Sequence, residues 1–503
     1  MTRPGGWVSQ PTVSLLVALL VVATAFAPVA AATARTDAAP AARPDSAASL
    51  QSQSAASPPS VNVTVERGDD LETVRLHLSF DAPAEARSFW VLDYTGNVVS
   101  TEGFVADETE DGDSGYRWDG ETASPSMTVE TSVDAAAGSG DSEGSEYAAT
   151  DAWTLVPTPK LAVAWLPADG SEWRYRRPLQ RESYPKRVEF VEAGVLGGSF
   201  LYVGQYEEYT RRADGQRFRV VVAANATPAT KPPEALDALA AASRRLPGES
   251  PDDVLAFVLP DPIRRGGFAA AKTDEFWVHE DAELSDPSNL WVHEYVHTRQ
   301  SFSLETRMQW FREASAGYFA ANASMRQGRV ERATVARTLR GKAFADATLS
   351  KPSTWSSHEV PYYRGPLVLW ALDRRIRQAT DGDRDLRDVF DRMNRQKGAM
   401  SYADFERIVA DVAGRSLDAW LERYVTTTER PGVKQLGVAA AEVDGPPGDG
   451  RGAPGDRPRL PGAAEYLSSA LALWSALALV GLAVGLTLGG RVADAAERFR
   501  DRR

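Results

Sequence analysis

Apolar and polar residues alternate along the segments that follow residue 60. Apolar residues take every second position in residues 61–65 and again in 74–80. Successive side chains of a strand point to opposite faces, so this period of two predicts half-buried strands. We therefore expect an N-terminal β-sandwich over residues 61–165. Within it, residues 106–148 are rich in Asp, Glu, Gly and Ser and predict a long acidic loop.

The apolar pattern changes in residues 166–435. Short apolar runs typical of strands alternate with one helical pattern up to about residue 285. From residue 289 the apolar spacing is helical throughout, which predicts a helical C-terminal half for this region. The expected helices there include residues 333–344, 364–379, 386–395 and 417–424. Ser401 is a favourable N-cap for a further helix.

Both ends of the chain carry patterns of their own. Residues 1–34 combine an early Arg, an apolar stretch and small residues, which is typical of a signal peptide. Residues 35–60 are mostly Ala, Ser, Pro and Gln and predict a disordered leader. Residues 436–465 are rich in Gly, Pro and Asp and predict a linker.

A charge-free segment then covers residues 466–490. At about 1.5 Å per residue a helix of this length crosses a hydrocarbon core of roughly 30 Å. The Arg-rich residues 491–503 follow, and the positive-inside rule assigns them to the cytoplasm. These patterns predict a single-pass protein of the cell membrane, with its C-terminus in the cytoplasm and the preceding domains outside.

Composition adds two constraints. The chain has 503 residues, a net charge of −13 and no Cys. An acidic surface gives no support for nucleic-acid binding, so we expect no nucleic acid among the partners. Without Cys there is no disulfide framework, and the compartment is inferred from the terminal segments instead.

Residues 293–297 read His-Glu-Tyr-Val-His and carry the candidate chemistry. His293 and His297 stand four residues apart, on one face of a helix, and can offer two imidazoles to one metal ion. Catalytic zinc takes three protein ligands and keeps one open position. Glu294 would then take a proton from the water that attacks a carbonyl. The alternative is a helix with two partly exposed histidines.

A third zinc ligand should come from a second helix nearby. Glu313 stands sixteen residues after His297, between aromatic residues and with helical spacing. A carboxylate is costly to bury there unless it is paired or binds a metal, so Glu313 is the first candidate. Glu305 is the rival, about two turns along the first helix if that helix continued. An ordinary surface Glu is the remaining interpretation of Glu313.

These motifs resemble a family. The H-E-x-x-H helix, followed by W-F-x-E-x-x-A-x-Y at residues 310–318, is similar to gluzincin zinc metallopeptidases of the aminopeptidase N, leukotriene hydrolase and glycyl aminopeptidase group. The stretch Val-Pro-Tyr-Tyr-Arg-Gly at residues 360–365 agrees. The resemblance covers about residues 190–430 and implies a thermolysin-like gluzincin catalytic domain within an α+β multidomain chain. It also implies that Tyr362 supports the oxyanion, with Tyr363 as the second choice.

Two features depart from the family pattern. Fifteen residues separate His297 from Glu313, fewer than is usual in aminopeptidase N. The family's edge-strand motif also contains a Glu that binds the free amino group of the substrate. Residues 266–272 read Gly-Gly-Phe-Ala-Ala-Ala-Lys and contain no carboxylate. This puts aminopeptidase specificity in doubt and leaves zinc hydrolysis intact.

The sequence as a whole predicts a membrane-anchored extracellular zinc metallopeptidase that hydrolyses peptide bonds. Its cofactor is Zn²⁺, and its substrate is a peptide or protein. His293, His297 and Glu313 are the expected metal ligands, and Glu294 and Tyr362 are the expected catalytic residues. The alternative is a non-catalytic cell-surface binding module on a gluzincin scaffold, because fold does not fix function.

Overall fold

The computed structural model describes residues 59–439 apart from short gaps. The gaps are residues 82–85, 94–97, 109–113, 137–145, 168–172, 181–183, 271–272 and 342–343. The expected signal peptide (1–34), nearly all of the leader (35–60) and everything from residue 440 onward lie outside the described residues.

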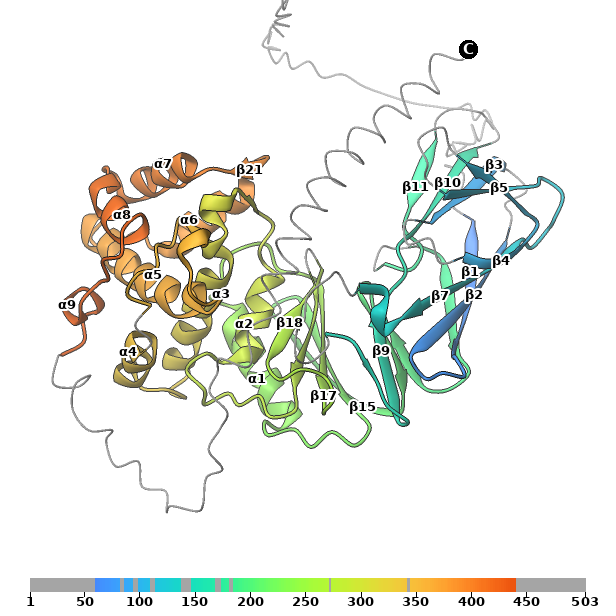
Figure 1. Ribbon diagram of the computed structural model, residues 1–503, viewed down its shortest axis with the longest axis horizontal. Coiled ribbons are helices and arrows are strands. Elements are labelled where there is room, and N and C mark those ends of the chain that lie inside the picture. The colour runs from blue at the N-terminus through green and yellow to red at the C-terminus, as the bar shows by residue number, and fades with distance from the viewer. Residues whose placement is uncertain are drawn as a thin grey trace, which may run out of the picture. The chain divides into compact units, whose positions relative to one another are not determined.

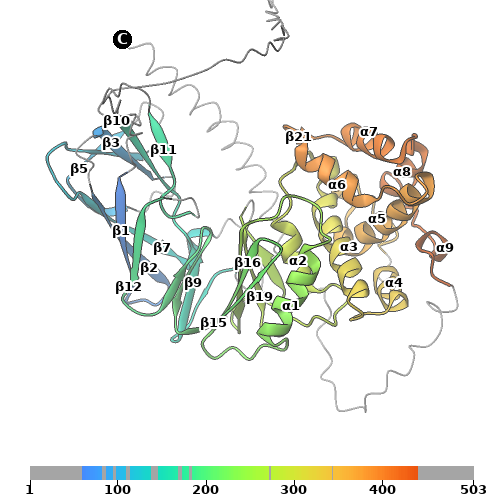
Figure 2. The same ribbon diagram turned by 180° about the vertical axis from the view of Figure 1, so that it is seen from behind.

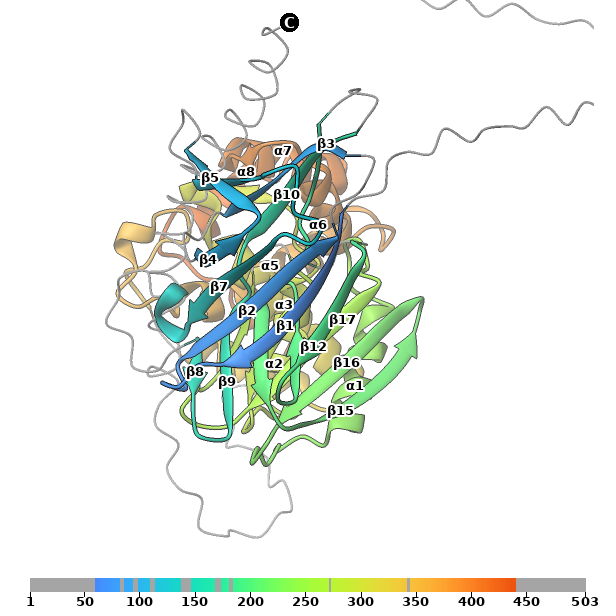
Figure 3. The same ribbon diagram turned by 90° about the vertical axis from the view of Figure 1, so that its right-hand side faces the viewer.

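The N-terminal part is built from strands. One five-stranded sheet has the order β12 (Lys186–Phe190), β1 (Ser60–Arg67), β2 (Thr73–Asp81), β7 (Ser126–Ser132) and β4 (Val98–Glu102). A second has the order β11 (Arg174–Arg176), β10 (Leu161–Pro167), β3 (Ala86–Asp93), β6 (Ser114–Trp118) and β5 (Phe104–Glu108). Figure 3 shows β1, β2 and β7 side by side in the first of these sheets.

Alternation explains how these sheets bury their core. Val61, Val63 and Val65 are at most 1 % exposed, while the residues between them face solvent. Aromatic side chains from different strands meet in the same core, with Phe89 and Phe104 edge to face at 5.4 Å. The predicted period-two strands are therefore present. The predicted acidic loop at residues 106–148 is wrong in part, because β6 and β7 lie inside it.

Strand pairing continues beyond residue 165. In the first sheet, β12 pairs in parallel with β1. A four-stranded sheet follows, in the order β13 (Gly194–Leu196), β14 (Phe200–Gly204), β9 (Trp153–Pro157) and β8 (Ala148–Ala149). A short 3₁₀ helix lies at Val133–Ala136. Residues 186–204 thus pair with the N-terminal strands, not with the sheet that precedes the H-E-x-x-H helix.

That next sheet is mixed and has five strands. Its order is β15 (Tyr206–Ala213), β16 (Gln216–Ala223), β17 (Asp253–Leu259), β19 (Glu275–His279) and β18 (Gly267–Ala269). The helices α1 (Pro232–Ser243) and α2 (Leu290–His297) pack on one face of it, through residues such as Val220, Ala256 and Trp291. The other face packs against the four-stranded sheet that contains β9 and β14. Figure 2 shows α1 and α2 on the helical side of this sheet.

The rest of the described chain is helical. Its helices are α3 (Trp310–Arg326), α4 (Arg332–Gly341), α5 (Val360–Ala379), α6 (Leu386–Arg395), α7 (Tyr402–Ala413), α8 (Asp418–Val425) and α9 (Val433–Leu436). Two short 3₁₀ helices accompany them, Thr306–Met308 just before α3 and Pro352–Thr354 between α4 and α5. Figure 1 shows these helices in yellow to red. The predicted N-cap is confirmed, since the Ser401 side chain accepts a hydrogen bond from the backbone N–H of Asp404.

The helices α3 and α5 approach each other closely at small residues. A Cβ added to Gly365 on α5 would lie 2.4 Å from the Cβ of Ala314 on α3. Any larger residue at position 365 would push the two helices apart. Since Glu313 precedes Ala314 and Tyr362 stands one turn before Gly365, this contact also sets the distance between two predicted site residues.

A short parallel pairing reaches across the sequence. The strand β20 (Ser303–Leu304), in the link between α2 and α3, pairs with β21 (Ala399–Met400), which precedes α7. The Asn394 side chain adds two hydrogen bonds to the same link, from the N–H of Ser301 at 3.0 Å and to the carbonyl of Arg299 at 2.8 Å. The link is therefore fixed by residues about 90 positions later in the chain.

The expected transmembrane helix requires a correction to the predicted fold class. Within residues 59–439, as far as they are described, no helix is long and apolar enough to cross a membrane. The longest of the described helices, α5, is interrupted by charge, with one Asp and four Arg in its 20 residues. Residues 466–490, on which the prediction rested, lie outside the described part of the chain. Over the described residues the fold is therefore β-rich in its N-terminal part and helical in its C-terminal part, and none of these residues forms a membrane span.

Candidate functional site

The H-E-x-x-H motif lies on α2, and an Asn residue holds the N-terminus of this helix in place. Asn289 adopts a left-handed backbone conformation with φ of 39°. Its side chain accepts a hydrogen bond from the N–H of Val292 at 3.2 Å and donates one to Ser324 Oγ at 2.8 Å. The first bond caps α2, because it satisfies one of the backbone donors that have no partner inside a helix. The second ties the start of α2 to α3.

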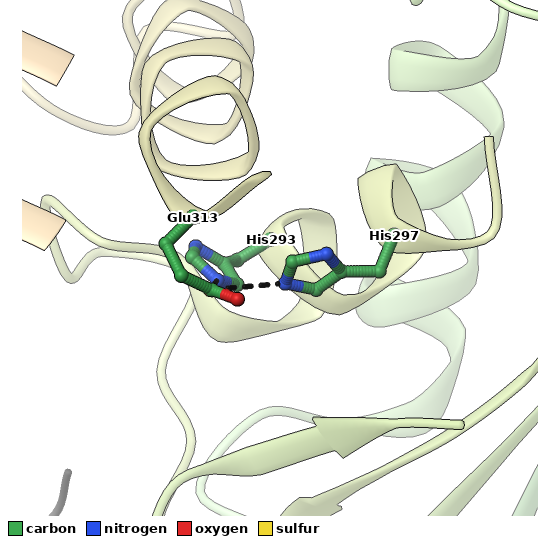
Figure 4. Close-up of side chains that lie close together, drawn as sticks. All are labelled: His293, His297 and Glu313. Carbon is green, nitrogen blue, oxygen red and sulfur yellow. Dashed lines mark hydrogen bonds and ion pairs between the residues drawn. The ribbon is translucent and has the colours of Figure 1, made fainter. Parts of the chain in front are cut away.

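Three side chains from α2 and α3 converge at the centre of the site. The Nε2 atoms of His293 and His297 each lie 3.2 Å from Glu313 Oε2. One ligand atom from each residue lies within 4.8 Å of the others. Figure 4 shows the two imidazoles on one face of α2 turned toward the carboxylate. The structure thus brings together the three residues that the sequence predicted as a metal-binding set.

The donor set fits zinc in chemistry and in spacing. Two imidazoles and one carboxylate form a known set for catalytic zinc. With zinc–ligand bonds of about 2.0–2.1 Å and a tetrahedral angle, two ligand atoms stand roughly 3.3 Å apart. The two observed distances of 3.2 Å are close to that value. Both histidine–carboxylate distances therefore already suit a metal ion shared by these residues.

Electrostatics within the cluster follows from burial and charge. Burial alone raises the pKa of Glu313, but the imidazoles of His297 and His293 outweigh it and hold the pKa well below its usual range. Burial alone lowers the pKa of His297, while the Glu313 charge outweighs it and raises the pKa to about 9. A metal ion must therefore displace a proton from this cluster when it binds.

Gln300 supports His297 from behind, a role that the sequence analysis missed. Its Oε1 lies 2.9 Å from His297 Nδ1. Its Nε2 donates to the Arg312 carbonyl at 2.8 Å and to Ser315 Oγ at 3.0 Å. Because a carbonyl can only accept, the orientation of the Gln300 amide is fixed, and Oε1 must accept from His297. The other imidazole nitrogen, Nε2, is thereby left to face Glu313.

Glu294 is 5 % exposed and lies against the edge strand β18. A Cβ added to Gly267 of that strand would lie 2.6 Å from Glu294 Oε1 and 2.7 Å from its Cγ. Only a glycine leaves room for this carboxylate. Burial raises the pKa of Glu294, and the imidazoles of His293 and His297 work against that rise. A buried carboxylate beside two metal-ligand candidates is the geometry of a general base.

The structure distinguishes Tyr362 from Tyr363, the two candidates for the residue that supports the oxyanion. The Tyr362 ring stacks on the His293 ring, with centroids 5.7 Å apart and planes at 13°. Burial, followed by the charges of Glu313 and Glu294, raises the pKa of Tyr362 well above its ordinary value. Its hydroxyl therefore stays protonated and can donate a hydrogen bond. Tyr363 turns elsewhere, with its ring 6.2 Å from that of Phe344.

Two other sequence-based interpretations are corrected. Glu305 is exposed and lies after α2 has ended, so it is not a ligand in the described cluster. The sequence favours a surface role over metal ligation for His279, which stands shortly before the motif, but in the structure it is 2 % exposed and contacts Asp281 Oδ1 at 2.7 Å and Asp261 Oδ1 at 3.3 Å. Burial alone lowers the pKa of His279, while these two carboxylates outweigh it and raise the pKa.

A buried ion pair also lies near the site. Arg264 Nη2 stands 3.8 Å from Glu146 Oε1, and both side chains are 7 % exposed. Burial raises the pKa of both Glu146 and Glu294. The Glu294 charge adds to the rise at Glu146, and the Arg264 charge opposes the rise at Glu294. Sequence reasoning missed the pair because the two residues are far apart in the chain and belong to no motif.

Comparison with known proteins supports the fold. No protein-family model and no curated protein matches the sequence. Among solved structures, an aminopeptidase N family protein from Idiomarina loihiensis matches with a TM-score of 0.50 and 9 % identity, over 75 % of this chain and 77 % of that one.

Two further matches are M1 zinc metallopeptidase structures from Deinococcus radiodurans. A variant bound to a Tyr-Ser-Ala substrate has a TM-score of 0.48 and 14 % identity, over 75 % of this chain and 95 % of that one. A second structure has a TM-score of 0.46 and 15 % identity, over 74 % and 94 %. The first of the three matches confirms the predicted resemblance at the level of fold: the described chain has the fold of the aminopeptidase N family.

Proposed function

We propose that this chain is a zinc metallopeptidase that hydrolyses peptide bonds, with a peptide or protein as substrate. The observation that carries the proposal is the convergence of His293, His297 and Glu313, at a spacing that fits zinc, with the buried Glu294 beside them. This set has two imidazoles, a ligand carboxylate and a second carboxylate free for proton transfer, which are the parts that such hydrolysis needs.

Each residue has a role that follows from its position. A bound zinc ion supplies Lewis acidity, which polarises a carbonyl and makes water more acidic. Glu294 accepts the proton of the attacking water and later gives it to the departing amine. Tyr362, held beside His293 with its hydroxyl protonated, donates a hydrogen bond to the oxyanion that develops on the substrate.

The alternative, a non-catalytic binding module, explains Glu294 less well. Glu294 is buried against Gly267, and burying a carboxylate lowers the stability of the fold. A binding module has no need for this carboxylate and could replace it with an apolar residue. Its presence beside an intact ligand set favours the catalytic interpretation.

Two variants of the full chain test the proposal. We expect wild-type protein to carry one zinc ion per chain by metal analysis, and His293→Ala to lose it. Glu294→Gln should keep the zinc and lose turnover of a quenched peptide library by about 10²- to 10⁴-fold, because only the proton-transfer group is removed. Stoichiometric zinc in His293→Ala would refute the site, and wild-type turnover in Glu294→Gln would refute the mechanism.

We also propose that the peptidase acts outside the cytoplasm. Support comes from the sequence of residues 1–34, whose basic start, apolar stretch and small residues are typical of an export signal. Cell fractionation should recover the protein outside the cytoplasm, whereas a cytoplasmic marker enzyme stays inside the cells. Recovery of the protein together with the cytoplasmic marker would contradict the proposal.

A further inference from the structure

The ion pair between Arg264 and Glu146 lies deep in the protein and leaves one polar atom of each side chain without a hydrogen bond. Each side chain is 7 % exposed, so both charges have lost most of their contact with water. Among the described residues, Arg264 Nε and Glu146 Oε1 are buried without a hydrogen-bond partner. The free energy lost when two such charges leave water can exceed the free energy gained from their attraction. A purely structural role therefore does not explain why this pair is buried.

Arg264 is held rigidly where it stands. Its Nη2 donates to the Gly267 carbonyl at 2.9 Å, and its guanidinium lies 5.0 Å from the centre of the Trp277 ring. The carbonyl bond ties it to the strand β18 at the glycine that touches Glu294. The cation therefore has a fixed place next to the proposed general base.

Glu146 comes from the other side, in the N-terminal part of the chain just before β8. Burial raises the pKa of Glu146, and the Arg264 charge opposes that rise. The distance of 3.8 Å is an ionic contact without a hydrogen bond. Glu146 is thus neutralised by Arg264, yet keeps an oxygen that accepts no hydrogen bond.

The Glu275 carboxylate, on the strand next to the edge strand, is occupied by backbone hydrogen bonds. Glu275 on β19 accepts hydrogen bonds from the backbone N–H groups of Gly198, Ser199 and Phe200, at 2.5, 2.9 and 3.2 Å. It fixes the turn between β13 and β14 and is not available to a substrate. Residues 266–270, the described part of the edge-strand stretch, contain no acid. Glu146 is then a candidate for the acid that meets a substrate amine, and its charge is already paired with Arg264.

We propose that Arg264 is a built-in counter-ion that cancels the charge of Glu146, so that the site takes peptides whose N-terminus is blocked or whose cleaved bond is internal. This inference rests on the proposed peptidase function and names its substrate class. A free ammonium group would have to approach a fixed guanidinium, which repels it. A neutral peptide segment meets no such repulsion.

One hexapeptide, prepared with a free and with an acetylated N-terminus, provides the test. Cleavage of both forms by the full zinc-loaded protein is followed by mass spectrometry, which also identifies the cleaved bond. We expect kcat/KM values for the two forms to agree within about threefold. A preference of about 100-fold or more for the free amine would overturn the inference.

Substitutions at the pair sharpen the result. In Arg264→Met the cation is gone, and Glu146 should attract the ammonium group, so that preference for the free form rises by about tenfold or more. In the double variant Arg264→Met/Glu146→Gln this gain should disappear. An unchanged preference in a folded Arg264→Met protein, with a wild-type circular dichroism spectrum, would overturn the inference. If Arg264→Met does not fold, the wild-type ratio decides alone.

Equilibrium binding separates this inference from the proposed function. Calorimetry on Glu294→Gln protein measures the affinity for each hexapeptide without turnover, and similar affinities are expected for the two forms. Absence of cleavage of either form by wild-type protein would contradict the peptidase proposal. The binding ratio would still decide the substrate class, because a strong preference for the free amine would overturn it.

Discussion

Replacing Gln300 by Met is the sharpest test of how the metal site is held. Met has nearly the same length, so the change removes polar contacts and preserves volume. Four hydrogen bonds of the Gln300 side chain are lost. It accepts from His297 Nδ1 at 2.9 Å and from Arg312 Nη1 at 3.3 Å, and it donates to the Arg312 carbonyl at 2.8 Å and to Ser315 Oγ at 3.0 Å. Since the first contact directs the other imidazole nitrogen toward Glu313, its loss frees the His297 ring to turn away.

The expected size of the effect follows from these contacts. Losing a group that orients a metal-ligating His typically weakens metal affinity about 10- to 100-fold, or roughly 1.4–2.7 kcal/mol. The metal-free protein should also become less stable by about 1–3 kcal/mol, because His297 Nδ1 is left buried without a partner. Zinc affinity and the stability of metal-free protein should therefore both fall.

Zinc affinity is measured by competition with a chromogenic chelator at fixed pH. Gln327→Met is the matched control, because Gln327 is also partly buried and donates to a carbonyl, that of Ala238, at 3.1 Å, but at the far end of α3. The control should lose some stability and keep its zinc affinity within about threefold of wild type. Equal zinc affinity in Gln300→Met and wild type would refute the idea that Gln300 positions His297.

Further predictions concern the base, the oxyanion donor and a buried His. Gly267→Ala should keep zinc but lower kcat about 10- to 100-fold by displacing Glu294; a normal kcat would show that this carboxylate has room to move. Tyr362→Phe should lower kcat about 10²-fold or more, and the neighbouring Tyr363→Phe should not; equal losses would leave Tyr362 without a special role. The raised pKa of His279 means that its ion pairs stabilise the fold fully below the ordinary value of 6.5 and lose this effect as pH rises through the folded value. The difference in unfolding free energy between wild type and His279→Gln should therefore shrink from pH 6 upward, and a constant difference would contradict the ion pairs.

Local patterns predicted the parts of the fold that depend on local rules. The helix expected at residues 386–395 has those same bounds in the structure, because Leu386, Val389, Phe390 and Met393 give it a strongly one-sided apolar face. The Ser401 cap was predictable because its partner is three residues away. The three ligand candidates were predictable because four-residue spacing on a helix and a buried acid on the next helix constrain them strongly.

Other features depend on tertiary structure and gave no local signal. The strands β6 and β7 were read as loop because Asp, Glu, Ser and Gly around them dilute the alternating pattern. A surface role was predicted for His279 because the sequence does not show that Asp261 and Asp281 lie beside it. The structure shows these ion pairs at the end of the buried strand β19. Arg264 and Glu146 meet only after the N-terminal strands pack on the mixed sheet. Gln300 could have been suspected, since it follows His297 by three residues.

The pairing of β20 with β21 has a consequence for the biogenesis of the protein. Residues 298–309 set how far Glu313 stands from the two histidines, and this link is held by Asn394 and by residues 399–400. A ribosome-bound chain that ends before residue 394 already contains the three ligand candidates, but not the residues that hold the link between α2 and α3 from the C-terminal side. The site therefore matures late in synthesis, after the helices α3 to α6 have been made. A nascent chain would pass through most of its translation without a finished metal centre, and so without the ability to cut neighbouring proteins.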